Sequence, residues 1–413
     1  MKKKMLKKLG LFILISATAV ILGGCGEKPK EIENVSLSLW VSGENEMYTD
    51  MINKFKEEYK DEAVFNITIS KESEATCKET VLASPERAAD LYIFADDQLD
   101  GLYSAGTLLE ITENTDDIIK ECGGKDTGAI KSVMRDNKIY AYPVTAGNGY
   151  FLYYNSKYFN KDDIKSLDRI IEIAEKNDKK FYMDFTSGWY VYSFFKGAGL
   201  DVNMNDDGTS NSCNWNATDT KYKGVDVAEA MLKIARSKAF ISGGDDHLLK
   251  GIEDGSVIAC VNGTWNSVAI GSAYGDNYAA SKLPEYTING DSVQMCSFAG
   301  YKLLGVNKYT KYPQWAMKLA RYLTNSENQL IRFETSGETP ANADVAASEE
   351  VQKAPAVAAL AQQSKYGYLQ RVAESYWTPT SVFGTIIISG NPDREDMQKL
   401  LDDMNDGITA KAH

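Results

Sequence analysis

An alternation of strand and helix patterns near the start of the chain constrains its fold most. Residues 35–41 alternate apolar and polar side chains, and residues 63–70 repeat this strand pattern after a stretch with apolar residues at helical spacing. A further helical stretch, which carries Pro85, leads to the apolar strand 90–95. This order predicts an open α/β sheet with crossover helices, and ligands on such sheets lie beyond the carboxyl ends of the strands.

The first residues read as a targeting segment. A basic start is followed by the apolar run 9–24, which is shorter than the roughly 20 residues needed to span a membrane. The sequence Leu22-Gly23-Gly24-Cys25 is similar to a bacterial lipobox, after which Cys25 would be acylated and would anchor the protein. A plain signal peptide and an uncleaved anchor are the alternatives. Residues 25–34 read as a flexible tether.

The charge of the chain narrows the class of ligand. Residues 1–24 contain five lysines and no acidic residue, so their removal changes the formal net charge from −13 to −18. Such an acidic protein is unsuited to nucleic acid or to adsorption on anionic lipid. It suits a neutral or a cationic ligand.

Residues for metal, redox or nucleophilic chemistry are sparse. Five cysteines follow Cys25, widely spaced and without a CxxC motif, so we expect no metal and no cofactor. The chain has two histidines, and a catalytic triad could be built only around His247. The polar stretch 200–219 reads as a surface hairpin and not as a calcium loop. The 58 acidic residues leave open a glycosidase with paired carboxylates.

A glycine-rich break and several tryptophans are candidate functional features. Residues 138–159 read as two strands around Gly147-Asn148-Gly149, which is either a hinge between lobes or a hairpin turn. The pattern predicts that the strand 257–261 ends at an Asn262-Gly263 turn shortly before Trp265. Trp189 and Trp377 also lie in polar stretches, where an aromatic ring could stack on the C–H face of a sugar. Core packing is the alternative for each tryptophan.

Five stretches in a fixed order carry a resemblance to a known family. They are LSLWVSGE, ADLYIFADDQLDGLYSAGTLLEIT, NKIYAYPV…LYYNSKYF, GSVIACVNGTWNS and YWTPTSVFGTIIISG. Behind a lipobox, they resemble the extracellular solute-binding proteins of family 1, the lipoprotein receptors of ABC sugar importers, in the maltose/maltodextrin branch. The resemblance covers nearly all of the chain after the leader.

The resemblance implies an α/β, two-lobed periplasmic-binding-protein-like fold with hinge crossovers between the lobes. Residues 35–146 with 299–344 would form lobe 1, and residues 147–298 with 345–413 would form lobe 2. The implied function is capture of an oligosaccharide, first of all a maltodextrin, for delivery to an ABC permease at the outer face of the cell membrane. The protein would act as a monomer, and no bond would be made or broken, so it would not be an enzyme.

The resemblance also implies a set of site residues. The implied substrate-binding residues are Trp40, Asp96, Asp97, Gln98, Asn148, Trp189, Tyr190, Trp265 and Trp377, and the implied lipidation site is Cys25. Maltose binders often have Arg where Gln98 stands and an acidic residue where Asn148 stands. The rival functions are a secreted glycosidase and a sensor module that presents a sugar to a membrane kinase.

Overall fold

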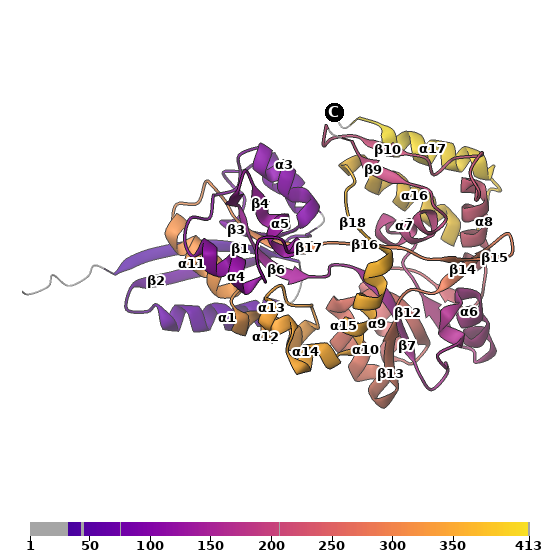
Figure 1. Ribbon diagram of the computed structural model, residues 1–413, viewed down its shortest axis with the longest axis horizontal. Helices are drawn as coiled ribbons and strands as arrows, with labels where there is room; N and C mark the ends of the chain where they lie inside the picture. Colours follow the sequence, from indigo (N-terminus) through magenta and orange to yellow (C-terminus); the bar gives the residue numbers. More distant parts are fainter. Residues whose placement is uncertain (1–31, 43–44, 75, 206, 412–413) are drawn as a thin grey trace, which may run out of the picture.

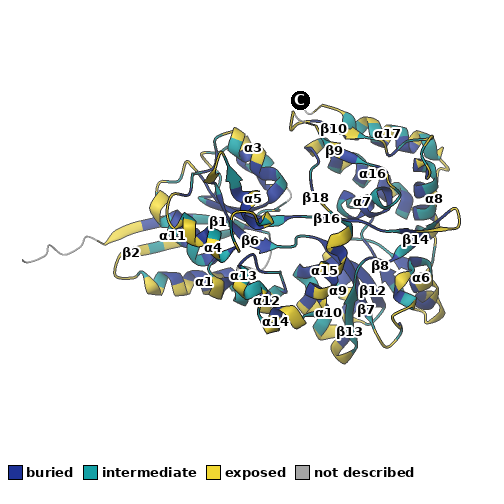
Figure 2. Ribbon diagram, in the orientation of Figure 1, coloured by how far each residue is buried: buried dark blue, intermediate teal, exposed yellow. Residues whose placement is uncertain are grey.

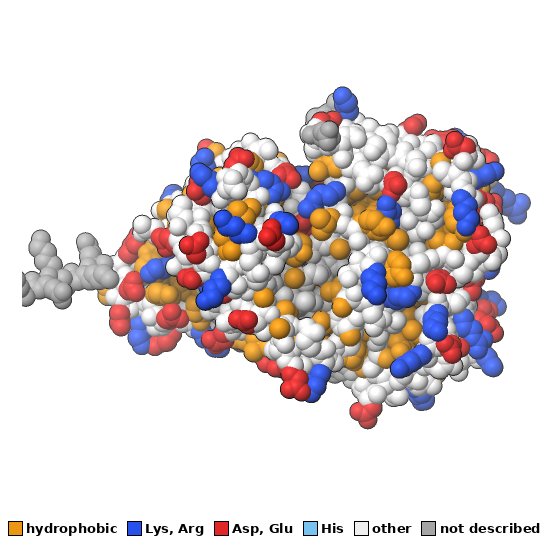
Figure 3. All heavy atoms as spheres, in the orientation of Figure 1, with side chains coloured by type: hydrophobic (Ala, Val, Ile, Leu, Met, Phe, Trp, Pro, Cys, Tyr) orange, Lys and Arg blue, Asp and Glu red, His pale blue; other side chains and the backbone are white. Residues whose placement is uncertain are grey.

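Two lobes lie side by side in the computed structural model, which describes residues 32–411 apart from 43–44, 75 and 206 (Figure 1). Each lobe contains a five-stranded sheet, and buried residues concentrate along the two sheets (Figure 2). On the face in Figure 3, basic and acidic side chains are intermixed over both lobes. This is the two-lobed α/β architecture that the sequence predicts.

The sheet of lobe 1 begins with the predicted alternation. Its strands β1 (Glu33–Val41), β2 (Ala63–Lys71) and β3 (Leu91–Ala95) are parallel and are connected by helices α1 (Asn45–Glu58) and α2 (Cys77–Ala83). The later strands β6 (Ala141–Ala146) and β17 (Tyr301–Val306) complete the order β2-β1-β3-β17-β6. Strand β17 is antiparallel to both of its neighbours. The other elements of lobe 1 are α3 (Leu99–Ser104), α4 (Thr115–Glu121), α5 (Gly128–Val133), β4 (Met134–Arg135), β5 (Lys138–Ile139), α11 (Pro313–Leu323) and α12 (Ser326–Ser336).

The sheet of lobe 2 has the order β11-β8-β12-β7-β13. Its strands are β7 (Tyr150–Asn155), β8 (Lys180–Tyr182), β11 (Phe240–Ile241), β12 (Val257–Gly263) and β13 (Tyr278–Ser281). The helices of this lobe are α6 (Leu167–Lys176), α7 (Gly188–Gly197), α8 (Gly224–Ala235), α9 (Asp245–Glu253), α10 (Ser267–Tyr274), α15 (Pro355–Gln363), α16 (Trp377–Ile388) and α17 (Met397–Thr409). Two hairpins complete it: β9 (Val202–Met204) with β10 (Asn211–Cys213), which confirms the predicted surface hairpin, and β14 (Glu285–Ile288) with β15 (Asp291–Gln294).

The chain passes between the lobes three times within the described residues. The first crossing joins β6 to β7, the second joins β16 (Ser297–Ala299) to β17, and the third runs through α13 (Ala343–Ala346) and α14 (Glu349–Lys353). The crossings touch one another, because the Ala146 amide donates to the Thr339 carbonyl (2.9 Å) and the Asn148 amide donates to the Gly300 carbonyl (2.8 Å). Strands β6 and β7 belong to different sheets, so the glycine-rich break is a crossing and not a hairpin turn. Gly147 has φ 83°, which favours glycine.

Each lobe has its own hydrophobic core. One cluster combines residues from the first 144 positions with residues of β17, α11 and Ala341, and the other combines residues 150–298 with residues 372–408. The exact lobe boundaries that we propose, at residues 146, 298 and 344, stay a prediction.

The expected turn at Asn262-Gly263 is wrong. Both residues belong to β12, in which Asn262 pairs with Phe151 and Gly263 with Tyr150 of β7. The Asn262 amide is fully buried, and it donates to Asp245 Oδ1 (3.0 Å) and to the Tyr190 hydroxyl (3.3 Å). These tertiary contacts satisfy a side chain that in isolation favours a turn.

Candidate functional site

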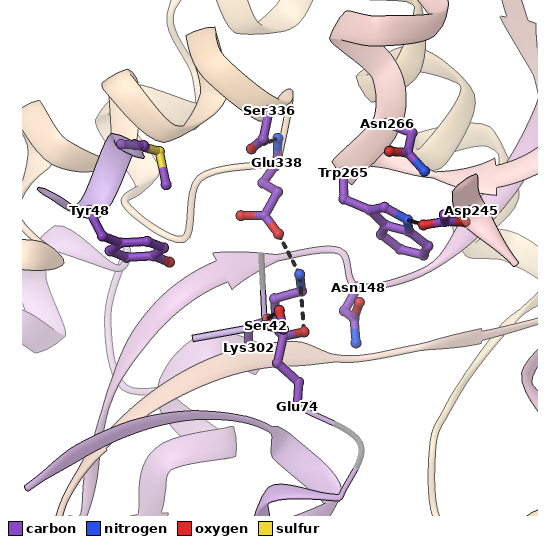
Figure 4. A pocket seen from close by; sticks show the side chains of 11 residues that line it. Ser42, Tyr48, Glu74, Asn148, Asp245, Trp265, Asn266, Lys302, Ser336 and Glu338 are labelled. Carbon is purple, nitrogen blue, oxygen red and sulfur yellow. Dashed lines mark hydrogen bonds and ion pairs between the residues drawn. The ribbon is translucent and has the colours of Figure 1, made fainter. Parts of the chain in front are cut away.

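A cavity of about 400 Å³ lies between the lobes beside the crossings (Figure 4). Lobe 1 contributes Ser42, Met47, Tyr48, Glu74, Lys302, Ser336 and Glu338, and the first crossing and lobe 2 contribute Asn148, Asp245, Trp265 and Asn266. These residues come from seven separate segments of the chain. The cavity is therefore a product of the lobe arrangement and not of any one loop.

Trp265 lines this cavity from the short helix η3 (Thr264–Asn266), which directly follows β12. Its indole N–H donates a hydrogen bond to Asp245 Oδ2 (3.0 Å), which fixes the orientation of the ring. The ring packs so closely over Gly263 that a Cβ there would lie 1.8 Å from a ring carbon. The missing side chain at Gly263 therefore makes room for the indole.

A buried charge cluster forms the opposite wall. The Lys302 ammonium pairs with Glu74 (3.1 Å) and with Glu338, and it lies 5.8 Å from the centre of the Trp265 ring across the lobe boundary. Burial alone would raise the pKa of Glu338, but the positive charges of Lys302 and Arg332 outweigh burial and lower it. Burial alone would lower the pKa of Lys302, but Glu338 and Glu74 outweigh burial and raise it. Lys302 and Glu338 are therefore both charged at neutral pH.

A second cavity of about 190 Å³ adjoins the first. Gln98 lines this second cavity, and its side-chain amide donates a hydrogen bond to the backbone carbonyl of Glu74 (2.6 Å). Glu74 in turn lines the first cavity. Asp97 and Trp377 also line the second cavity, together with Glu374 of the helix η6 (Glu374–Tyr376). The structure thus divides five of the nine predicted site residues between the two cavities, with Asn148 and Trp265 in the first and Asp97, Gln98 and Trp377 in the second.

The second cavity is lined by carboxyl groups. Burial and the neighbouring charge of Asp96 raise the pKa of Asp97 to about 7. Burial and the charge of Glu79 raise the pKa of Glu374 to about 7. Asp97 Oδ2 accepts a hydrogen bond from the Gln370 amide (2.5 Å), whereas Oδ1 is buried without a hydrogen-bond partner among the described residues. A hydroxyl donor from a ligand would satisfy this oxygen.

The remaining predicted site residues lie outside both sets of lining residues. Asp96 is 2% exposed and uses both carboxylate oxygens, accepting from the Tyr301 amide (2.8 Å) and from Arg371 (3.0 Å). Trp40 packs toward the ring of Tyr92, and Tyr190 is buried with its hydroxyl at Asn262.

Trp189 has a half-buried ring close to Phe298 (5.3 Å between centroids). Its indole N–H is buried without an acceptor in the described part of the chain. Like Asp97 Oδ1, this atom is a buried polar atom that a ligand could satisfy.

Sequence reasoning missed the charged wall of the first cavity. Lys302 stands alone as a charge in the apolar strand β17, and a lone lysine there was a usable signal, because a buried lysine needs a partner. Its partners Glu74 and Glu338 lie in polar loops and gave no comparable signal. Asp245 was equally inconspicuous at the start of α9.

The described residues also bear on metal binding, on membrane-spanning helices and on disulfides. No group of three or more His, Cys, Asp or Glu side chains within residues 32–411, the four excepted positions aside, is arranged to hold a metal ion. Over the same residues, no helix is both long and apolar enough to cross a lipid bilayer. Cys77, Cys122, Cys213, Cys260 and Cys296 are all free thiols. Cys25 lies outside the described residues.

Two lobes that enclose an aromatic ring and several carboxylates between them are typical of proteins that bind a small molecule. The chain belongs to the family of bacterial extracellular solute-binding proteins, whose sequence profile matches residues 50–359. It therefore belongs to a class of proteins that bind solutes.

Named relatives and a solved structure resemble the chain over most of its length. The galactooligosaccharide-binding protein of Bacillus subtilis (strain 168) is 26% identical, with 94% of each chain covered. The maltodextrin-binding protein MdxE of the same organism is 25% identical, with 87% of this chain and 86% of the relative covered. A structure solved with acarbose is 26% identical, covers 91% of this chain and 99% of that chain, and superimposes with a TM-score of 0.77.

Proposed function

We propose that this protein is the membrane-anchored receptor of an ABC importer and that it captures an oligosaccharide between its lobes. The observation that carries the proposal is the placement of Trp265 in the interlobe cavity, opposite the carboxylates of Glu74 and Glu338. An aromatic face and a rim of hydrogen-bond acceptors are the two features that a neutral sugar needs. The ligands named for the two Bacillus relatives are both oligosaccharides, which supports the same class.

A starch-derived α-glucan is our first candidate ligand, and a galacto-oligosaccharide is the second. MdxE is named for maltodextrin, and the structure solved with acarbose also supports an α-glucan. The other Bacillus relative supports the galacto-oligosaccharide. Calorimetric titration with maltotriose, maltotetraose, a galacto-oligosaccharide and a β-linked glucan series tests the choice. We expect saturable binding of the maltodextrins, and binding of galacto-oligosaccharides alone would replace the first candidate with the second.

The same titrations address the rival functions. A glycosidase would release reducing sugar from the bound oligosaccharide, so an unchanged ligand after prolonged incubation supports a binding protein. Capture for import predicts that deletion of the gene slows uptake of the bound sugar by whole cells. A sensor module would instead change the transcriptional response to the sugar and leave uptake intact.

The anchor is a separate part of the proposal. Leu22-Gly23-Gly24-Cys25 follows a basic and apolar leader, as acylation of Cys25 requires. We expect the protein to fractionate with membranes and the Cys25→Ala variant to be released or misprocessed. Normal processing and unchanged membrane attachment of Cys25→Ala would exclude a lipid anchor at Cys25.

A further inference from the structure

Gln370 and Arg371 connect the lobes through side chains that belong to neither cavity wall. The backbone of this segment is held at the start of the second crossing, because β18 (Gly367–Leu369) pairs with β16, and the Gln370 amide donates to the Ala299 carbonyl (3.0 Å). The Arg371 carbonyl accepts from the Met204 amide of β9 (2.8 Å). Both side chains then reach the helix η1 (Asp96–Gln98) of lobe 1.

The contact of Arg371 is an ion pair with a buried carboxylate. Arg371 Nη2 lies 3.0 Å from Asp96 Oδ2, and the Asp96 side chain is 2% exposed. The other oxygen of Asp96 accepts from the Tyr301 amide at the start of β17. Asp96 therefore joins lobe 1, the second crossing and the lobe 2 segment at one point, and separation of Arg371 would leave a buried charge poorly compensated.

The contact of Gln370 occupies a carboxylate that faces a cavity. The Gln370 side-chain amide donates to Asp97 Oδ2 at 2.5 Å, and Gln370 is only 5% exposed. An amide N–H and a sugar hydroxyl are the same kind of partner for a carboxylate, since each donates one hydrogen bond to it. Gln370 thus donates to Asp97 the same kind of hydrogen bond that a ligand hydroxyl would donate.

We propose that Gln370 and Arg371 form an interlobe latch on Asp96 and Asp97 that keeps the lobes together without ligand, and that a ligand hydroxyl replaces Gln370 at Asp97. In the latched form Gln370 occupies Asp97 Oδ2, so this form competes with a ligand hydroxyl for that oxygen. The apparent affinity is then the intrinsic affinity multiplied by the fraction of unlatched molecules, because only unlatched molecules bind the ligand. The second half of this inference rests on the proposed sugar-binding function, and the first half does not.

The first test needs no ligand. Small-angle X-ray scattering compares the ligand-free wild type with the Gln370→Ala/Arg371→Met variant. The expected result is a larger radius of gyration for the variant, with an intact circular dichroism spectrum and a cooperative melting transition. The control is Arg169→Met, which removes an exposed ion pair with Asp163 inside lobe 2 and should not change the radius. An unchanged radius in the folded double variant overturns the latch.

Single variants protect the test against misfolding and identify the contact. Arg371→Lys keeps the positive charge and should restore most of the compactness that Arg371→Met loses. In the wild-type background, Gln370→Ala should increase the radius of gyration of the ligand-free protein. In the Asp97→Ala background it should have no further effect, because the hydrogen bond between the two residues is already absent. An equal effect of Gln370→Ala in both backgrounds would show that Gln370 acts elsewhere and would refute its contact with Asp97.

The second test uses the oligosaccharide that binds the wild type in calorimetry. Gln370→Ala should bind it roughly 2- to 10-fold more tightly, as expected when one competing hydrogen bond is removed. Weaker binding would show that Gln370 contacts the ligand directly and would overturn its role as a competitor. If the wild type binds no oligosaccharide, the proposed function fails, whereas the scattering experiment still decides whether the latch exists.

Discussion

The indole of Trp265 is fixed at its edge by Asp245 and lines the interlobe cavity. Its ring is half-buried, unlike that of Trp215, which is fully buried and stacks on Phe195 with centroids 4.3 Å apart. The two tryptophans therefore offer a comparison between a ring at a cavity and a ring in a core. Side chains of one type have different roles because of what each one touches.

Replacement of Trp265 should separate binding from stability. We expect Trp265→Ala to weaken oligosaccharide binding by about 2 kcal/mol, as at other aromatic anchors. It should cost less than the roughly 3–5 kcal/mol of a core Trp→Ala change, which we expect for Trp215→Ala. Titration calorimetry and urea unfolding on both variants measure the two effects. A strongly destabilised Trp265→Ala protein with wild-type affinity would make Trp265 a core residue.

Lys302 lines the cavity, but we expect its main role to be the stabilisation of two buried carboxylates. Its side chain is 10% exposed and is the shared partner of Glu74 and Glu338. We expect Lys302→Met to lower the free energy of unfolding by about 3 kcal/mol, because two carboxylates lose a buried cation. The matched control is Lys353→Met, which removes an exposed pair with Glu349 and should cost less than about 0.5 kcal/mol. Equal losses in urea unfolding would mean that the buried cluster adds no stability.

At the scale of elements, the junction of β12 and η3 places the ring in the cavity. Strand β12 is buried along its whole length, and Gly263 is its last residue. A side chain at this position would overlap the Trp265 ring. The position of the indole therefore depends on the end of the strand as much as on the tryptophan itself.

We expect Gly263→Ala to move the indole and to weaken ligand binding while the protein still folds. The added methyl group would lie within 2.4 Å of three ring carbons, so the ring has to rotate away. Gly271→Ala in α10 is the control, since its added Cβ meets nothing closer than 3.7 Å. Tryptophan fluorescence and titration of both variants follow the ring and the affinity. Unchanged affinity in Gly263→Ala would show that the exact ring position does not matter.

Local patterns predicted the elements, and tertiary contacts decided what the patterns missed. The strands β1 and β3 were predictable because their alternation or apolar character is visible within a few residues. The extension of β12 through Asn262 was not, since Tyr190 and Asp245 satisfy its amide from distant segments. The same limit applies to the site: strand ends pointed to Trp265 and Asp97, but the pairing of Lys302 with Glu74 and Glu338 joins residues far apart in the sequence. No local pattern encodes such pairs.

At the scale of the whole molecule, the packed lobe boundary should make stability depend on pH. Asp97 has a pKa raised to about 7 by burial and by Asp96, against the opposing effects of Gln370, Arg371 and Lys78. In the unfolded chain this carboxyl group has an ordinary pKa of about 4. The folded protein therefore binds more protons in this window, and the free energy of unfolding falls as the pH rises from about 4 to about 7.

We expect Asp97→Asn to remove this part of the pH dependence. The difference in the free energy of unfolding between wild type and Asp97→Asn should shift against the wild type between about pH 4 and about pH 7. Urea unfolding at a series of pH values measures it. Glu374→Gln should act in the same direction, because burial and Glu79 raise the pKa of Glu374 to about 7 as well. Parallel curves for wild type and Asp97→Asn would mean that Asp97 is charged throughout this range.

The strand order of lobe 1 also determines when this protein can fold during its synthesis. Strand β17 lies between β3 and β6, although it comes after the whole sheet of lobe 2 in the sequence. A nascent chain that has not yet reached Val306 thus leaves the facing edges of β3 and β6 unpaired. Contacts so distant in sequence form slowly. A ribosome must therefore produce about three quarters of the polypeptide before the first lobe can close its sheet.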